Sequence, residues 1–387
     1  MEQARRSIAA PARRIHMKEI NIARTLLAKR KGKAITQDEL AAYIGVSKAS
    51  VSKWETGQSY PDITFLPQLA AYFNISIDEL IGYEPQMTRE DIKKLYHRLT
   101  GDFGGKPFDE VIDECRTVIR KYYSCFPLLL QMAVLLVNHY MLAGDKAAQE
   151  AVLRETLDLC RRIRTEDDDV RRINEAISLE AVSLMLLQRP DEVLDLLDGS
   201  MKPAVSNEAI LAGAYQMTGR IEKAKDVLQI GLYQHLIGLF GIAAGYLALC
   251  QDAPERFETV WQRIHSIAGT FNMDQLHPGI MMPLYLNAAQ GYVLQNKQNR
   301  ALDMIGKYVD VCCAAGTFPI ILHGDAFFDR LDPWFAEFDL GSQAPRDEKV
   351  IKKSMLQAIT DNPVFAALSD TPEYQSAVVR LKARIGD

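Results

Sequence analysis

The stretch TQDELAAYIGVSKASVSKWETG, residues 36–57, decides the fold of this chain. Thr36 and Glu39 have the spacing of a capping box, in which each side chain binds a free backbone N–H at the start of a helix. The helix that they open ends at Gly45, because glycine readily takes the left-handed backbone conformation that closes a helix. The beginning of the stretch therefore predicts one short helix with well-defined ends.

A second helix follows almost at once. Ser47 is placed to cap it, and it covers residues 48–55 before Gly57. Two helices joined by a turn that contains glycine form a helix-turn-helix unit. The residues expected to face inward are Leu40, Ala41, Ile44, Val46, Val51 and Trp54. The residues expected to face outward on the second helix are Lys48, Ala49, Ser50 and Lys53.

Three more short helices are predicted around this unit. Residues 17–30 carry an apolar stripe at helical spacing. Residues 61–63, Pro-Asp-Ile, lead into a helix that ends at Phe73. A second capping box at residues 76–79 opens a last helix, which ends at Gly82. Residues 17–83 thus read as a domain of five helices.

Charge separates the start of the chain from the rest. Residues 1–53 carry 12 Lys or Arg and four acidic residues, whereas the whole chain has a net charge of −5. A basic end on an acidic body indicates that the basic end meets a polyanion. A solvated basic tail would give the same count, but the helices that follow it favour the first interpretation.

Residues 17–83 closely resemble the xenobiotic-response-element (Cro/C1 repressor) type of helix-turn-helix domain. The matching features are T-Q-x-x-L-A, the G-V-S turn, S-x-W-E-x-G, P-D-I, L-A-x-x-F and the close S-x-D-E-L-I-G. The resemblance implies that the second helix of the motif lies in the major groove of double-stranded DNA. By position, Gln37 would touch a phosphate and Ser52 a flanking phosphate. The residues that would face base edges are Lys48, Ala49, Ser50 and Lys53.

Residues 1–16 have two interpretations. They form a basic arm that reaches the minor groove, or they precede a true start at Met17. The second is favoured, because domains of this type begin within a few residues of their first helix. Residues 84–106 are expected to be a linker and connecting helix.

The remainder of the chain predicts helix after helix. Turn signals near residues 144, 189, 219, 252 and 296 are spaced by 30 to 45 residues, which brackets the tetratricopeptide period of about 34 residues. The segments AILAGAYQMTGRIEKAKDVL (209–228) and NAAQGYVLQNKQNRALDMI (287–305) resemble such repeats. We therefore expect an all-α chain with a tetratricopeptide-like α-solenoid over residues 107–316, the alternative being a non-repeat bundle. Residues 317–387 are expected to cap the solenoid or to form a dimer surface.

A solenoid of helix pairs presents a concave face that can hold a ligand. Asparagine amides both donate and accept hydrogen bonds, so a row of them could bind the backbone of an extended peptide. The candidate groove residues are Asn138, Asn174, Asn207, Tyr246 and Asn287. The alternative for each is a local cap or a satisfied polar group.

The sequence contains no pattern typical of catalysis, metal binding or redox chemistry. The six cysteines lack zinc or redox spacing and are expected to be reduced core thiols. No phosphate loop, zinc-protease or serine-hydrolase motif occurs, so neither an enzyme, a metal nor a cofactor is predicted. The acidic run at residues 166–169 is expected to mark the start of a helix. The apolar stretch at residues 236–250 is shorter than a membrane span and is expected to be a buried helix, and the N-terminus lacks the apolar segment of a signal peptide.

A helix-turn-helix followed by degenerate helical repeats resembles the peptide-pheromone-responsive regulators of Gram-positive bacteria. The resemblance implies a cytoplasmic homodimer that binds a two-fold operator and whose repeats bind a short peptide. A second hypothesis is an interaction scaffold or antitoxin-like regulator, whose repeats bind a folded protein partner. An enzyme with an unrecognised site is the third and weakest.

Overall fold

The computed structural model describes residues 21–83, 86–198, 207–314 and 316–385. The regular elements in these ranges are helices, and one isolated antiparallel bridge joins Ile321 to Gln343. The chain divides into two compact units: the residues up to Thr88 together with Thr117–Phe126, and the remainder. The predicted all-α class is confirmed. The expectation for residues 1–16 lies outside the described residues.

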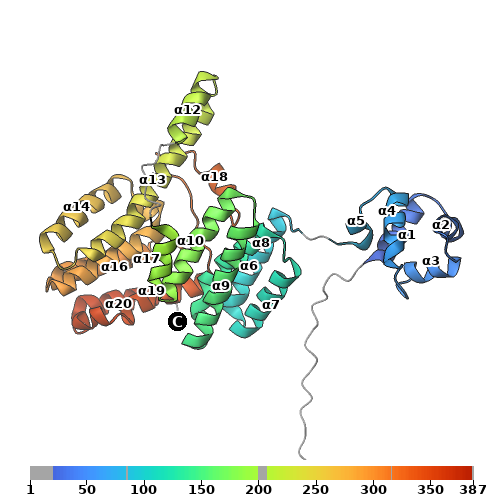
Figure 1. Cartoon of the computed structure of the whole chain (residues 1–387). Coiled ribbons are helices and arrows are strands. Elements are labelled where there is room, and N and C mark those ends of the chain that lie inside the picture. Colours follow the sequence, from blue (N-terminus) through green and yellow to red (C-terminus); the bar gives the residue numbers. More distant parts are fainter. Residues whose placement is uncertain (1–20, 84–85, 199–206, 315, 386–387) are drawn as a thin grey trace, which may run out of the picture. The chain divides into compact units, whose positions relative to one another are not determined.

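The first unit contains the five predicted α-helices and one 3-10 turn (Figure 1). Thr36 and Glu39 form the predicted capping box, with Glu39 Oε2 accepting from the Thr36 N–H at 2.7 Å. The elements are α1 (Ile22–Gly32), α2 (Gln37–Ile44), α3 (Lys48–Glu55), η1 (Ile63–Phe65), α4 (Leu66–Phe73) and α5 (Ile77–Ile81).

Each of these five helices contributes one fully buried aliphatic side chain to a common core. These residues, all 0% exposed, are Leu26, Leu40, Val51, Leu69 and Leu80. Burying a side chain of this size contributes about 1.5–3 kcal/mol. Because every helix supplies one, the position of α3 depends on the whole domain and not on its own short sequence.

From α6 onward the chain is a succession of longer helices. The first part contains α6 (Arg89–Gly105), α7 (Phe108–Lys121), α8 (Phe126–His139), η2 (Tyr140–Leu142), α9 (Lys146–Glu166), α10 (Val170–Leu186) and α11 (Pro190–Leu197). The middle part contains α12 (Asn207–Met217), α13 (Ile221–Leu249), α14 (Pro254–Thr270), α15 (Met273–Leu276), α16 (Pro278–Leu294) and α17 (Gln298–Cys313). The last part contains α18 (Asp332–Ala336), α19 (Glu348–Thr360), η3 (Pro363–Leu368) and α20 (Pro372–Ile385).

All five turns predicted between helices lie between helices. The α12–α13 turn uses Gly219 at φ +74°, and the α16–α17 turn uses Asn296 at φ +56°. Of the predicted pairs, α10 and α11, α12 and α13, and α16 and α17 pack against each other, whereas α9 packs mainly against α10. Helical hairpins are therefore the building units of this region, as expected, and their tetratricopeptide character stays a prediction.

One helix differs from the prediction. The sequence predicted one helix ending near residue 233 and a separate buried helix over residues 236–250, but α13 runs unbroken from Ile221 to Leu249. The glycines of α13, at residues 231, 238, 241 and 245, do not stop the helix, because each costs only about 1 kcal/mol in a helix interior. Much of α13 is also exposed, since Ile242 and Leu249 are 75% and 81% accessible. Among the described helices, it is the one long and apolar enough to cross a membrane by length and composition alone.

The C-terminal helices pack against α17 and contact α6. Tyr308 of α17 donates to the Met355 carbonyl of α19 at 2.9 Å, and Tyr374 of α20 donates to the Ile359 carbonyl at 3.0 Å. Phe365 is fully buried in the same core. The expected role of residues 317–387 in capping the solenoid or forming a dimer surface stays a prediction. All six cysteines are free, and five of them are buried.

Candidate nucleic-acid interface

The turn between α2 and α3 is fixed by local sequence. Gly45 closes α2 at φ +81°, and its N–H donates to the Ala41 carbonyl at 2.9 Å. Ser47 Oγ accepts from the Ser50 N–H at 3.1 Å and so caps α3. The Ser50 hydroxyl lies 2.9 Å from the same oxygen. Residues 45–47 therefore form the turn and set the direction in which α3 begins.

The inner side of α3 holds the helix against the domain. Val51 and Trp54 are buried, and the Trp54 ring lies 5.9 Å from the ring of Phe65. The inward set predicted from the sequence is thus in the core, with Val46 half-buried at its edge. Trp54 is a core residue, and its ring is not part of the exposed face.

The outer side of α3 carries the residues predicted to meet DNA. Lys48, Ala49 and Lys53 are exposed, and Ser50 and Ser52 are half-buried. The face has two positive charges and otherwise short side chains. With two lysines and short neutral side chains, most of the attraction of this face for DNA would be electrostatic.

Lys48 is not free in this structure. Its Nζ lies 2.7 Å from Asp38 Oδ2 on α2, and the two side chains are 60% and 62% exposed. An exposed pair of this kind is worth only about 0–1 kcal/mol. A phosphate or a guanine edge can therefore replace Asp38 as the partner of Lys48.

Gln37, the predicted phosphate contact, is held by a charged pair. Its Nε2 donates to Glu55 Oε2 at 2.8 Å, and Glu55 also accepts from Arg30 Nε at 2.5 Å and Nη2 at 2.8 Å. Burial alone would raise the pKa of Glu55, but the hydrogen bonds from Arg30 and Gln37 outweigh it, and the pKa is lowered. The network joins α1, the start of α2 and the end of α3.

Sequence reasoning missed Asp38 and Glu55 as parts of this site. Both residues stand within the quoted stretch, but their partners lie 10 and 25 residues away along the chain. Helical periodicity relates residues on one helix only, so no spacing rule indicated these pairs.

The five candidate groove residues do not form a hydrogen-bonded row among the described residues. Asn138 donates to the Val134 carbonyl of its own helix at 2.8 Å, which is a local role. Asn287 donates to the Ala244 carbonyl of α13 at 3.0 Å, close to Tyr246. Asn174 and Asn207 are exposed.

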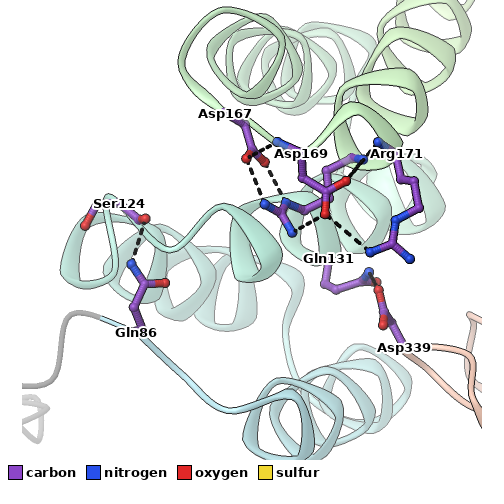
Figure 2. A network of polar contacts seen from close by, with 8 residues as sticks. Gln86, Ser124, Gln131, Asp167, Asp169, Arg171 and Asp339 are labelled. Carbon is purple, nitrogen blue, oxygen red and sulfur yellow. Dashed lines mark hydrogen bonds and ion pairs between the residues drawn. The ribbon is translucent and has the colours of Figure 1, made fainter.

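The acidic run at residues 166–169 joins the end of α9 to the predicted helix start, which is that of α10. Asp169 caps α10 by accepting from the N–H groups of Arg171 and Arg172. Asp167 accepts from Arg172 Nε at 2.6 Å and Nη2 at 2.8 Å (Figure 2). The carboxylates are thus bound by N–H groups and guanidinium, and the described residues contain no group of three or more side chains suited to a metal ion.

Comparison with known proteins bears on the first unit. The helix-turn-helix family matches residues 26–80. The HTH-type transcriptional activator BcrR of Enterococcus faecalis is 37% identical over 78 residues, which are 19% of this chain and 38% of BcrR. The uncharacterized HTH-type transcriptional regulator YobD of Bacillus subtilis is 26% identical over 96 residues, 24% of this chain and 86% of YobD. The match to BcrR thus spans well under half the length of that protein.

Solved structures align over more of the chain but weakly. PlcR of Bacillus thuringiensis, in complex with the peptide PapR7 and DNA, is 14% identical over 76% of this chain and 94% of its own, with a TM-score of 0.30. The apo form of ComR from S. thermophilus covers the same shares at 14% identity with a TM-score of 0.22. Scores this low establish no common fold. The helix-turn-helix match is specific, and the chain therefore carries at residues 26–80 a helix-turn-helix domain of the xenobiotic-response-element, Cro/C1 type.

Proposed function

We propose that this protein is a sequence-specific DNA-binding transcriptional regulator of the cytoplasm, with α3 as the helix that enters the major groove. The observation that carries the proposal is the exposed outer face of a capped, core-anchored α3 within a matched helix-turn-helix domain. Relatives of this domain include a transcriptional activator and a transcriptional regulator.

In this proposal some side chains contact base edges and others contact phosphates. Lys48 and Lys53 donate to guanine edges or phosphates, and Ala49 and Ser50 contact thymine methyl groups or base edges. Gln37 and Ser52 bind phosphates on either side. With two lysines and otherwise short side chains on α3, affinity should fall steeply as salt rises.

The protein acts as a homodimer on a two-fold operator in this proposal, and α13 supplies the surface. Exposed apolar residues recur along α13 at steps of three and four, the spacing of a coiled-coil seam, except between Leu232 and Leu239, where the exposed His235 takes the intervening position. The apolar residues are Leu228, Leu232, Leu239, Ile242, Tyr246 and Leu249. We name these six the α13 seam. A seam of this period fits one more helix lying nearly parallel or antiparallel to α13.

The glycines beside the α13 seam also favour a second helix as the partner of α13. Gly238, Gly241 and Gly245 lie on the flank of α13, and no atom of another described element comes within 4 Å of where a Cβ would be. Small residues let two helix backbones approach closely, and here no other described element occupies that space. A second copy of α13 would bury apolar seam against apolar seam, which is why we favour a homodimer over a polar partner.

The helical region senses a ligand in this proposal, either a short peptide or a partner protein. Exposed amides at Asn174 and Asn207 remain available to a bound backbone, whereas those of Asn138 and Asn287 hold carbonyls of the chain. The peptide interpretation therefore rests on the two exposed asparagines and Tyr246.

The decisive experiment is genome-wide binding by the tagged protein and by its Lys48→Ala/Lys53→Ala variant. A few sharp peaks over a two-fold-symmetric motif, lost in the variant, are expected. A matched control, Lys349→Ala/Lys353→Ala on α19, removes the same charge from the helical region and should keep the peaks. Diffuse binding by the unmodified protein would contradict sequence-specific recognition.

The second candidate function is a scaffold whose repeats hold a folded partner. The exposed α13 seam is the observation that favours it, because a heterologous helix could cover the seam as well as a second copy does. Size-exclusion chromatography with light scattering separates the two. A dimer of the purified chain supports the regulator as proposed, and a monomer that captures one protein through α13 supports the scaffold.

A further inference from the structure

A cavity of about 420 Å³ lies within the helical region, apart from the DNA-binding domain. Its walls come from α16, α17, α19 and two extended segments near residues 320–322 and 342–346. Most of the lining is apolar, including Met282, Leu286, Tyr308, Ile320, Leu322 and Met355. The volume falls in the range of about 300–1,000 Å³ that is usual for small-molecule sites.

Hydrogen bonds hold these walls in place and leave few free polar groups. The Leu322 N–H donates to the Ser342 carbonyl at 2.8 Å, and the Ala344 N–H donates to the Ile320 carbonyl at 3.2 Å. Tyr308, although it lines the cavity, uses its hydroxyl on the Met355 carbonyl. The cavity is therefore a built, largely apolar space and not a gap between loosely placed loops.

One charged side chain, Arg346, lines this cavity, and it also lines a smaller pocket beside His97 and Thr100 of α6. Arg346 is half-buried, and no hydrogen bond or ion pair to its guanidinium occurs within the described ranges. The nearest acids along the chain have other partners: Asp347 accepts from the Lys349 N–H at 2.9 Å, and Glu348 pairs with Lys352 at 2.6 Å. Burial lowers the pKa of Arg346, yet a guanidinium stays protonated in proteins. A charge with reduced solvation and no partner is costly unless an anion joins it.

His277 adds a polar group on the same wall. Its Nδ1 accepts from the Ile280 N–H at 3.2 Å, so the proton of the neutral ring sits on Nε2. Burial lowers the pKa of His277, which favours this neutral form at pH 7. The wall therefore offers a cation and a neutral donor in a space that is otherwise apolar.

We propose that this cavity binds a small apolar carboxylate, with the carboxylate on Arg346 and the aliphatic body against Met282, Leu286 and Met355. Guanidinium and carboxylate match in charge and in their planar two-pronged geometry. A medium-chain fatty acid and the C-terminal residue of an apolar peptide both carry this chemistry. The assignment of this ligand as the effector rests on the proposed function, but binding itself does not.

The test measures binding of octanoate and 1-octanol to the full-length protein by calorimetry. The unmodified protein should bind octanoate at least tenfold more tightly than 1-octanol. Arg346→Gln should lose at least tenfold in octanoate affinity and keep its affinity for 1-octanol, which would also show that the cavity is intact. Arg300→Gln, which removes an exposed guanidinium paired with Glu258, should change neither.

A second binding experiment tests whether the ligand is the C-terminus of a peptide and not a fatty acid. Acetyl-Leu-Leu with a free carboxylate is compared with its C-terminal amide, and preference for the acid that is lost in Arg346→Gln supports a peptide terminus. Equal octanoate binding by Arg346→Gln and the unmodified protein, or no binding of either acid, would overturn the proposal. Thermal unfolding verifies that Arg346→Gln is folded. Its operator binding without ligand should be normal, so failure here leaves the DNA-binding proposal intact.

Discussion

Asp38 of α2 holds the ammonium of Lys48, on α3, at 2.7 Å across the helix-turn-helix. The acid lies beside the face proposed to meet DNA, where it both neutralises Lys48 and repels phosphate. We therefore expect Asp38 to lower the affinity of the proposed face for DNA in general.

Asp38→Asn should therefore tighten DNA binding. We expect Kd to fall about two- to fivefold, equivalent to about 0.5–1 kcal/mol, because an exposed pair contributes little and only its competition is removed. Fluorescence anisotropy with a labelled operator at fixed salt measures it. Asp252→Asn, at an exposed loop position with the same charge change, is the control. Weaker binding by Asp38→Asn would mean that Asp38 itself contacts the operator.

The Glu55 carboxylate should dominate the stability of the DNA-binding domain. Glu55→Gln leaves the Arg30 guanidinium buried without its counter-charge, and we expect a loss of about 3 kcal/mol. Amide hydrogen exchange in α1 and α3 reports this loss separately from the helical region. Glu79→Gln breaks the exposed pair with Lys29 at 2.6 Å and should cost less than about 1 kcal/mol. Equal losses in the two variants would refute the role given to Glu55.

Buried His139 makes the helical region sensitive to acid. Its pKa is lowered to about 4 by burial, with Nδ1 bound to the Leu135 carbonyl and the ring stacked on Phe103. An unfolded histidine titrates near about 6.5, so the unfolded chain binds the extra proton first. Stability should be full above pH 6.5 and fall by up to about 1.4 kcal/mol per pH unit toward pH 4.

His139→Phe keeps an aromatic ring against Phe103. It should reduce the pH dependence of the unfolding free energy by the contribution of about one bound proton. Urea unfolding of a Trp54→Phe background measures it, because Trp261 and Trp334 then report the helical region alone. The exposed His323, changed to Gln, should leave the slope unchanged. An unaltered slope in His139→Phe would show that other groups set the acid limit.

The α13 seam should control assembly. Ile242→Glu places a charge in the middle of the seam, and we expect the dimer dissociation constant to rise at least tenfold because the carboxylate would have to be desolvated. Light scattering over a concentration series measures it. Val379→Glu alters an equally apolar exposed site on α20 and should leave the dimer intact. Dissociation by Val379→Glu alone would move the interface to the C-terminal helices.

Local signals in the sequence predicted the DNA-binding domain well. Thr36, Gly45 and Ser47 act through backbone groups at most four residues away, so their spacing alone is sufficient. The residues on the outer face of α3 could be predicted from the same helix boundaries. The side-chain partners of Lys48 and Gln37 could not be predicted, because they depend on how separate helices pack.

The helical region was less predictable in two places. The repeat-like segment ending near residue 233 and the apolar stretch from residue 236 read as two helices in the sequence, but they form one continuous helix, α13. Residues 320–322 and 342–346 lie outside the helices, so no periodicity in the sequence indicated that Ile320 and Gln343 would form a cavity wall beside Arg346.

The hydrogen bond from Asn287 to the Ala244 carbonyl has a thermodynamic consequence. The donor, Asn287 on α16, follows Leu286, which lines the cavity. The acceptor, Ala244 on α13, lies between Ile242 and Tyr246 of the α13 seam. A ligand in the cavity and a partner chain on the seam would therefore each bind next to one end of this hydrogen bond. If a carboxylate strengthens pairing by some factor, the paired state must hold that carboxylate more tightly by the same factor. The concentration of the protein would then set the threshold at which it responds to its ligand.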